Sequence, residues 1–212
     1  MNLVILGPQG SGKGTQAEML VEKYGFSHIE TGRILRAISA SDNPLAEEIS
    51  KTLSEGKLVS DEILEKVLTE KLSIPSPNGY LFDGTPRNVK QYDLLKYLLG
   101  LLGQKIDRLV YIWISEEEVV RRLSSRRTCL KCGNVYNLIT NPSPRGNVCA
   151  CGGELVQRAD DSPDAIKKRL TWGFTKEVKQ KAEEDGILLE INGERSIEEI
   201  HKEIVERLGL NG

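Results

Sequence analysis

Short apolar runs alternate with longer amphipathic segments along this chain. The runs rich in Leu, Ile and Val predict β-strands, and the amphipathic segments between them predict helices. We expect strands at Asn2–Leu6, Ser27–Ile29, Tyr80–Phe82, Leu109–Ile114 and Ile187–Ile191. Strands that alternate with crossover helices are typical of a parallel sheet, so the pattern predicts an α/β fold with a five-stranded parallel sheet flanked by helices.

Two predicted helix starts carry their own signals. Ser115 with Glu118, and Ser196 with Glu199, match the capping box, in which the two side chains satisfy free amides of the first turn. The first of these helices is expected to span Ser115–Arg127.

Two segments interrupt the alternation. Residues 31–74 contain amphipathic patterns but no strand, and residues 128–161 are rich in Gly, Pro, Asn and Cys and lack helical periodicity. A loop of that length inside a compact domain is functional or has its own small fold. We therefore expect a core made of residues 1–30, 75–127 and 162–212, with 31–74 and 128–161 as two inserts.

Composition excludes several classes of protein. The 212 residues include 39% apolar residues, and 29 basic against 31 acidic side chains give a net charge of −2. Such a chain can bury a core and is not intrinsically disordered. A general nucleic-acid binder would show a basic excess, so no nucleic-acid partner is expected.

The N-terminal run Leu3–Leu6 is too short for a signal peptide or a membrane span, so we expect a cytoplasmic protein without membrane association. The four cysteines lie close together, at Cys129, Cys132, Cys149 and Cys151. In a reducing compartment, such a cluster indicates a metal site before disulfides.

A glycine-rich loop, GPQGSGKGT at Gly7–Thr15, follows the first predicted strand and precedes a predicted helix over Gln16–Tyr24. Glycines at such a junction let successive N–H groups point at one anion, and the helix dipole adds to their effect. Lys13 supplies a charge for terminal phosphates, and Thr15 a hydroxyl for phosphate or magnesium. The general motif has Ser or Thr directly after Lys, whereas Gly14 intervenes here.

Asp83 directly follows the third predicted strand. In open parallel sheets ligands lie beyond the carboxyl ends of the strands. An Asp at that edge, beside a phosphate loop, is the expected position for a magnesium-ordering carboxylate.

The GKGT ending resembles that of the adenylate kinase family, and so do TGRILR at Thr31–Arg36, GKLVSDE at Gly56–Glu62 and DGTPR at Asp83–Arg87. The resemblance covers nearly the whole chain. It implies a P-loop nucleoside monophosphate kinase fold in which residues 31–74 form an AMP-binding insert. The implied AMP-binding residues are Thr31, Gly32, Arg36, Lys57, Leu58, Val59, Gly84, Thr85, Pro86, Arg87, Gln91, Arg158 and Arg169.

The same resemblance implies which residues bind ATP and which promote transfer. The ATP-binding residues would be Gly10, Ser11, Gly12, Lys13, Gly14, Thr15, Arg122, Arg126, Val135, Tyr136 and Arg195. The catalytic set would be Lys13, Arg87, Arg122, Arg126, Arg158 and Arg169. Because phosphoryl transfer needs little covalent help from the protein, a ring of Lys and Arg is the expected catalytic apparatus.

The cysteine insert resembles the zinc-bearing long lid of bacterial adenylate kinases, so residues 128–161 are expected to form a small zinc lid with one structural zinc per chain. Relatives space the second pair as Cys-x-x-Cys or Cys-x-x-Asp, whereas Cys149 and Cys151 are separated by one residue. That spacing leaves two possibilities, either a strained four-sulfur site or a site with one ligand replaced.

Two positions depart from the family pattern. Arg33 stands where the family has an acid near the water shell of magnesium, and Thr85 replaces an aromatic residue. Neither change removes the phosphate-binding set, but metal affinity and the packing of the insert can differ.

The resemblance implies a monomeric enzyme that transfers a phosphoryl group from magnesium-bound ATP to AMP and forms ADP. A kinase for UMP or CMP is the alternative of the same class, although Thr31 and Gln91 favour adenine. A non-enzymatic alternative is a nucleic-acid-binding zinc ribbon on a nucleotide-switch domain. It is disfavoured because Lys131 and Arg145 are the only charges, and Tyr136 the only aromatic, between Cys129 and Cys151.

Overall fold

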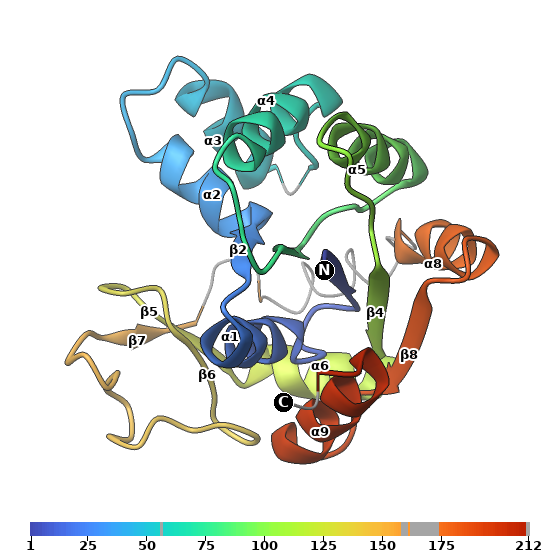
Figure 1. Ribbon diagram of the computed structural model, residues 1–212. Helices are drawn as coiled ribbons and strands as arrows, with labels where there is room; N and C mark the ends of the chain where they lie inside the picture. The colour runs from blue at the N-terminus through green and yellow to red at the C-terminus, as the bar shows by residue number, and fades with distance from the viewer. Residues whose placement is uncertain (56, 158–160, 162–173, 211–212) are drawn as a thin grey trace. The chain divides into compact units, whose positions relative to one another are not determined.

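The computed structural model describes residues 1–55, 57–157, 161 and 174–210 (Figure 1). They form two compact units. The first unit contains Met1–Gly7, Gly12–Trp113 and 174–210, and the second contains Pro8–Ser11, 114–157 and Asp161. Within the described ranges, no helix is both long and apolar enough to cross a membrane.

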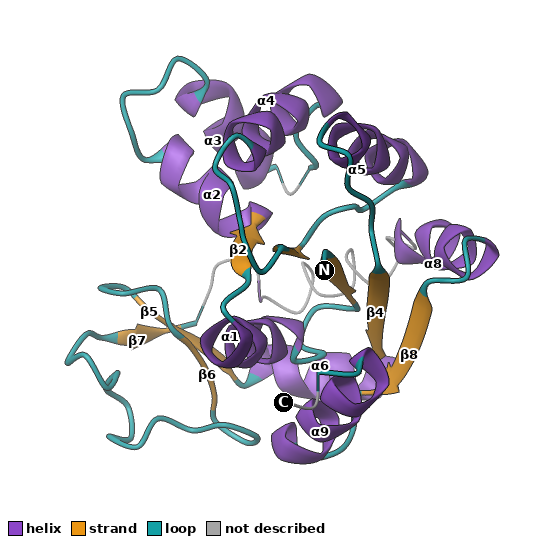
Figure 2. Ribbon diagram, in the orientation of Figure 1, coloured by secondary structure: helices purple, strands orange, loops and turns teal. Residues whose placement is uncertain are grey.

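The first unit is built on a five-stranded parallel sheet, which confirms the predicted α/β fold (Figure 2). Its strands lie in the order β2-β3-β1-β4-β8. Their bounds are β1 Leu3–Leu6, β2 Ser27–Glu30, β3 Tyr80–Asp83, β4 Arg108–Trp113 and β8 Leu188–Asn192. All five predicted strands are present, and no strand end differs from the expected one by more than one residue.

The central strand β1 is buried on both faces, as its uninterrupted apolar sequence requires. Leu3 and Ile5 point to the face that is covered by α1 and α9, whereas Val4 and Leu6 point to the face covered by α5 and α8. The helices on these faces span Lys13–Tyr24 for α1, Val89–Leu101 for α5, Phe174–Glu184 for α8 and Ile197–Leu208 for α9.

The segment between β2 and β3 is helical, with α2 at Thr31–Ser39, α3 at Ala46–Ser54 and α4 at Asp61–Leu72. Its described residues contain no strand. Ile49, Leu64 and Leu68 are fully buried and join the core that lies on the α5 face of the sheet. Helix α4 begins at a cap in which the Ser60 hydroxyl accepts a hydrogen bond from the Ile63 N–H at 3.3 Å.

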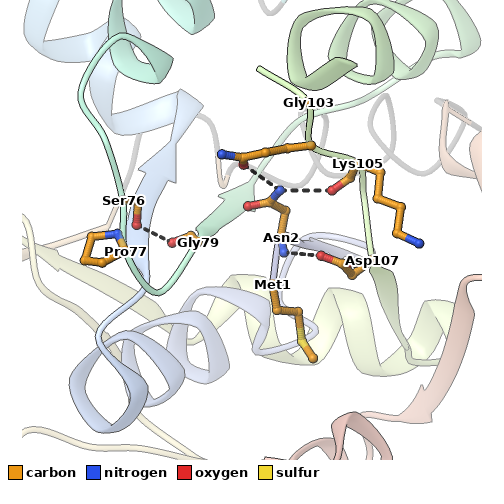
Figure 3. A pocket seen from close by; sticks show the side chains of 9 residues that line it. Met1, Asn2, Ser76, Pro77, Gly79, Gly103, Lys105 and Asp107 are labelled. Atoms are coloured by element: carbon orange, nitrogen blue, oxygen red, sulfur yellow. Dashed lines mark hydrogen bonds between the residues drawn. The ribbon is translucent and has the colours of Figure 1, made fainter. Parts of the chain in front are cut away.

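The amino ends of three strands are held together by Asn2 (Figure 3). Its backbone N–H donates to Asp107 Oδ2 at 2.7 Å, its Nδ2 donates to Gln104 Oε1 at 2.9 Å, and its Oδ1 accepts from the Tyr80 N–H at 3.0 Å. A polar cavity of about 330 Å³ opens beside these contacts. It lies at the edge of the sheet opposite the carboxyl ends of the strands, and we assign it a structural role.

The second unit contains α6 at Glu116–Ser124 and a three-stranded antiparallel sheet in the order β6-β5-β7. These strands span Arg126–Cys129 for β5, Val135–Asn137 for β6 and Leu155–Val156 for β7. The predicted helix over 115–127 is therefore too long. Ser125 ends α6, and the chain turns there into β5, because Arg126 and Thr128 pair with Asn137 and Val135 of β6.

One predicted capping box is confirmed and the other is half formed. Around Ser196 both reciprocal hydrogen bonds are present. At Ser115 the hydroxyl accepts from the Glu118 N–H at 3.4 Å, but the Glu118 carboxylate pairs with Arg121 and Arg122 instead of returning to the cap.

Candidate active site and metal centre

The phosphate loop joins β1 to α1, as its sequence predicts, and α1 begins at Lys13 rather than at Gln16. Gly12 precedes the helix with a φ of 89°, in the left-handed region where glycine carries no steric cost. The helix is fixed in the first unit by Gln16, whose Nε2 donates to the Ile197 carbonyl at 2.9 Å. The N-terminus of α1 therefore follows the glycine loop directly, where its amides and dipole favour an anion.

Asp83 lies against this loop. It is the last residue of β3 and is 5% exposed, and a Cβ placed on Gly14 would lie 3.7 Å from its Oδ2 atom. Strand pairing places Asp83 beside Ile5 of β1. The carboxylate therefore lies next to the phosphate loop, where a magnesium-bound phosphate would need it.

Two arginines of the first unit lie over two glycines. A Cβ on Gly32 would lie 3.2 Å from Arg36 Nη1, and a Cβ on Gly84 would lie 3.7 Å from Arg87 Nη2 and 4.0 Å from the Gly32 nitrogen. Arg87 Nε also donates to the Gly84 carbonyl at 2.8 Å. The structure thus brings the two guanidinium groups to the N-terminus of α2, an arrangement suited to a phosphate.

Polar side chains expected at the adenine lie in the same unit and are buried. Thr31 is 5% exposed, and its Oγ1 has no hydrogen-bond partner among the described residues. Gln91 is 3% exposed, and its Oε1 accepts from the Arg87 N–H at 2.8 Å, which orients the side-chain amide. Val59 is buried, and so is Thr85, whose Oγ1 also lacks a partner in the described part of the chain.

In the second unit, Arg122 lies on the chain segment Pro8–Ser11. Its Nη1 donates to the Gly10 carbonyl at 3.3 Å, and its Nε donates to Glu118 Oε1 at 2.5 Å. A Cβ on Gly10 would lie 3.2 Å from the Cβ of Arg122, so the loop needs glycine at that position. Ser11 is fully buried beside it, and its Oγ has no partner in the described residues.

Glu118 holds two arginines of α6. Hydrogen bonds from Arg121 and then from Arg122 lower the pKa of its carboxyl to about 2. In the sequence, Glu118 was predicted only as part of a cap. Its spacing of three and four residues from the two arginines was the signal for this second role.

The helix predicted over 115–127 would place Arg126 on the same helix face as Arg122, four residues earlier, and this prediction is wrong because Arg126 begins β5. Its guanidinium instead makes two hydrogen bonds to the buried Asp161, from Nε to Oδ2 at 2.8 Å and from Nη2 to Oδ1 at 2.5 Å. Such a bidentate pair fixes the plane of the guanidinium.

The remaining predicted residues are spread over both units. In the first, Lys57 pairs with Glu55 at 2.7 Å, and Arg195 pairs with Glu203 after the end of β8. In the second, Val135 is exposed at the start of β6. Arg158 and Arg169 lie outside the described residues.

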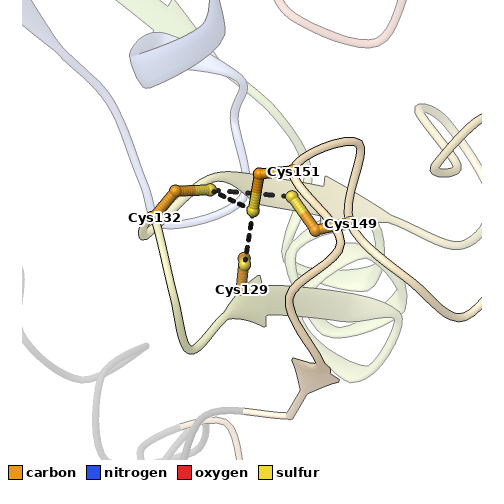
Figure 4. Close-up of side chains that lie close together, drawn as sticks. All are labelled: Cys129, Cys132, Cys149 and Cys151. Carbon is orange, nitrogen blue, oxygen red and sulfur yellow. Dashed lines mark hydrogen bonds between the residues drawn. The ribbon is translucent and has the colours of Figure 1, made fainter.

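The four cysteine sulfurs converge in the second unit (Figure 4). All four Sγ atoms lie within 4.8 Å of one another. Neighbouring sulfurs are 3.6 Å apart for Cys129 and Cys151, 3.6 Å for Cys132 and Cys149, and 3.4 Å for Cys132 and Cys151. Sulfurs around a tetrahedral metal with bonds of ~2.3 Å are about 3.8 Å apart. Both cysteines of the short Cys-x-Cys pair thus reach the cluster.

The surroundings of the cluster fit a metal ion. A Cβ on the buried Gly153 would lie 2.5 Å from Cys129 Sγ, so this glycine leaves space for the sulfur. Hydrogen bonds from the Cys151 N–H and then from the Tyr136 hydroxyl lower the pKa of the Cys149 thiol to about 6. A thiolate at neutral pH is the form that binds a metal. Gly153 was not predicted as a residue of the metal site, although the pair Gly152-Gly153 was a signal in the sequence.

A phosphate loop at the carboxyl edge of a parallel sheet, a carboxylate beside it and paired arginines at a second helix N-terminus define a P-loop phosphotransferase. The family model of adenylate kinase matches residues 5–182. The chain is similar to adenylate kinases of Geobacillus sp. (40% identity, covering 99% of both chains), Methanothrix thermoacetophila (43%, 96% of both) and Archaeoglobus fulgidus (40%, 96% of both).

The chain therefore belongs to the adenylate kinase family. This membership confirms the predicted class, a nucleoside monophosphate kinase that binds ATP. The alternatives of a UMP or CMP kinase and of a nucleic-acid-binding zinc ribbon gain no support from these similarities.

Proposed function

We propose that this protein catalyses the reversible transfer of the terminal phosphoryl group of ATP to AMP, which forms two molecules of ADP. The observation that carries the proposal is the convergence of Arg36 and Arg87 on the N-terminus of α2 in a chain of the adenylate kinase family. A phosphate monoester is the ligand for which two guanidinium groups and free helix amides are suited.

Residues of the first unit are proposed to bind AMP and the ATP phosphates. Arg36 and Arg87 bind the AMP phosphate, and Thr31, Gln91 and the backbone at Val59 bind adenine. The buried Thr31 Oγ1, which has no hydrogen-bond partner among the described residues, supports a role in binding a polar group of the ligand. Lys13 and the amides of Gly12–Thr15 bind ATP phosphates, and Asp83 orders the water shell of magnesium.

Residues of the second unit are proposed to bind ATP through Gly10, Ser11, Arg122, Arg126, Val135 and Tyr136. Arg122 and Arg126 are held in place by Glu118 and Asp161. The resemblance adds Arg158 and Arg169 to the catalytic set. Pre-oriented cations of this kind stabilise the charge of a transferring phosphoryl group without reorganising during the reaction.

The metal held by the four cysteines is proposed to be zinc, and its role structural. Zinc prefers thiolates in tetrahedral geometry, and four sulfurs leave no open position for substrate. The segment 31–74 is proposed as the AMP-binding insert and 128–161 as the zinc lid. We further propose a monomer that works in the cytoplasm.

A coupled assay of the purified protein with magnesium, ATP and each nucleoside monophosphate tests the function. AMP should be the preferred acceptor, because a site built from polar groups rejects analogues that leave those groups unpaired. Phosphorylation of UMP or CMP as efficient as that of AMP would overturn the assignment to adenine.

A further inference from the structure

Glu30 lies at the proposed AMP phosphate site. It is the last residue of β2 and the residue before α2, and strand pairing places it beside Asp83 at the carboxyl edge of the sheet. Its side chain is 29% exposed. Glu30 therefore lies at the edge of the sheet where open parallel sheets bind ligands, although neither the sequence pattern nor the expected site included it.

The Glu30 carboxylate contacts the arginine expected to bind phosphate. Oε1 lies 3.5 Å from Arg36 Nη2, and Oε2 lies 3.9 Å from Arg33 Nη1. The carboxylate thus lies between two arginines of the first turns of α2. A negative charge near the N-terminus of a helix is also favourable in itself.

An incoming phosphate would be bound by the same cationic groups. Arg36 lies over Gly32, and the Gly32 nitrogen lies near Gly84, over which Arg87 is placed. A phosphate that contacts both guanidinium groups lies within a few ångströms of the Glu30 carboxylate, and like charges at that separation repel each other.

We propose that Glu30 is an affinity-setting residue, an internal anion that pairs with Arg36 in the free enzyme and opposes the phosphate of AMP. This inference rests on the proposed function, because it takes Arg36 as a phosphate ligand. The carboxylate occupies Arg36 before AMP arrives, and it repels the phosphate dianion afterwards. Both effects weaken AMP binding. Among the described residues, Glu30 makes no hydrogen bond or ion pair with Thr31 Oγ1 or with Gln91, the two side chains expected at the adenine.

Equilibrium binding of AMP and of adenosine, measured by calorimetry on the full-length protein, tests this proposal. Glu30→Gln keeps the shape of the side chain and removes its charge. We expect it to lower the Kd for AMP by about threefold to tenfold, because it removes one negative charge that repels the phosphate at a partly exposed position. Adenosine has no phosphate, so its Kd should be the same in both proteins.

Two further variants serve as controls. Glu30→Asp retains the charge, and its Kd for AMP should stay closer to that of the wild type than to that of Glu30→Gln. Glu65→Gln removes an exposed carboxylate from α4 and should change neither Kd. In steady-state assays the KM for AMP should fall in Glu30→Gln. The Kd for ATP, from equilibrium binding, should not change.

A Kd for AMP that is unchanged in Glu30→Gln would overturn the proposal. A Kd that rises would show instead that Glu30 holds Arg36 in place, and it would overturn it as well. So would an equal fall in the Kd for adenosine, since the effect would then not act through the phosphate. Any of these three results leaves the proposed function intact if the enzyme phosphorylates AMP. A wild-type protein that binds no AMP would overturn both the proposed function and the role of Glu30.

Discussion

The Tyr136 hydroxyl lies 3.5 Å from Cys149 Sγ, and it also accepts a hydrogen bond from the Ala150 N–H at 3.3 Å. Tyr136 belongs to β6 and is paired with Arg127 of β5, the strand that runs from Arg126 to Cys129. A residue expected at the ATP is therefore also part of the surroundings of the metal site.

Tyr136→Phe should weaken metal binding. The hydroxyl supports a thiolate ligand, and the loss of such outer partners costs about 10- to 100-fold in metal affinity. Competition with a chromophoric chelator measures the affinity, and the charge-transfer bands of the cobalt-substituted protein report the cysteine ligands. The exposed Tyr97, in α5, supplies the control. Tyr97→Phe should bind metal like the wild type, and equal affinity in Tyr136→Phe would show that the contact has no effect.

Gly153→Ala should weaken metal binding as well. The added Cβ would lie 2.5 Å from Cys129 Sγ and 2.7 Å from the Cβ of Lys131, so sulfur or backbone must move. The Gly153 carbonyl also accepts a hydrogen bond from the Cys149 N–H at 2.9 Å, which ties its backbone to a second ligand. Elemental analysis and chelator competition measure the effect. Gly100→Ala in α5, where no atom lies within 4 Å of the added group, is the matched control. Wild-type affinity in Gly153→Ala would contradict the geometry of the cluster.

Removal of the metal should lower the melting temperature but leave measurable activity when magnesium is present. A metal bound to the four cysteines would join residues that are distant along the chain, from Cys129 to Cys151, in a unit whose described part has few buried apolar side chains. The protein should be unfolded in chelator, refolded with and without zinc, and then compared by calorimetry and by the coupled assay. One zinc per chain is expected. Elemental analysis that finds no zinc would refute the site, and full affinity in Cys149→Ser alone would exclude four-sulfur binding.

The parts of the fold that depend on local pattern were predictable from the sequence. All five strands of the parallel sheet were predicted, and the apolar run is unbroken in the central strand β1, which is buried on both faces, whereas the edge strands β2 and β8 are only partly buried. The end of α6 was not predictable in this way. The arginines that follow Ser125 continue a helical spacing, and only their pairing with β6, a contact distant in sequence, turns them into a strand.

The candidate site likewise contains residues that were predictable from the sequence and residues that were not. The phosphate loop and Asp83 follow strands directly, so sequence alone placed them. The approach of Arg36 to Arg87 and the position of Glu30 beside Arg36 depend on how β2 and β3 pair, which spacing along the chain does not reveal. The spacing of Cys149 and Cys151 likewise left the number of sulfur ligands open until their three-dimensional positions were known.

Lys13→Ala and Arg87→Ala should each lower turnover by about 10²–10³, because each removes a charge that stabilises a phosphate in the transition state. Neither belongs to the apolar core of the first unit, so thermal unfolding should change little. Lys23→Ala at the far end of α1 and Arg108→Ala at the amino end of β4 remove exposed charges from the same unit. Both should keep wild-type turnover. Turnover close to that of the wild type in Lys13→Ala or Arg87→Ala would refute the proposed role of that residue.

Glu118 should make part of the stability depend on pH. Its pKa is lowered to about 2 from an ordinary value of 4.5, first by the hydrogen bond from Arg121. A carboxyl whose pKa is lower in the folded protein contributes stability at pH above 4.5 and loses that contribution as the pH falls toward 2. Glu118→Gln should therefore lower the free energy of unfolding by about 1–2 kcal/mol at neutral pH, after allowance for solvent screening.

The difference between Glu118→Gln and the wild type should shrink as the pH falls from 5 to 3, because Glu118 of the unfolded wild-type chain takes up a proton in this range while the folded protein keeps the carboxylate charged until the pH nears 2. Thermal unfolding measured at intervals across this range gives the difference at each pH. Glu117→Gln removes an exposed carboxylate from the same helical turn, so it controls for the loss of negative charge near the start of α6. If the two variants show the same small and pH-independent difference from the wild type, the pairing of Glu118 with Arg121 and Arg122 does not stabilise the second unit.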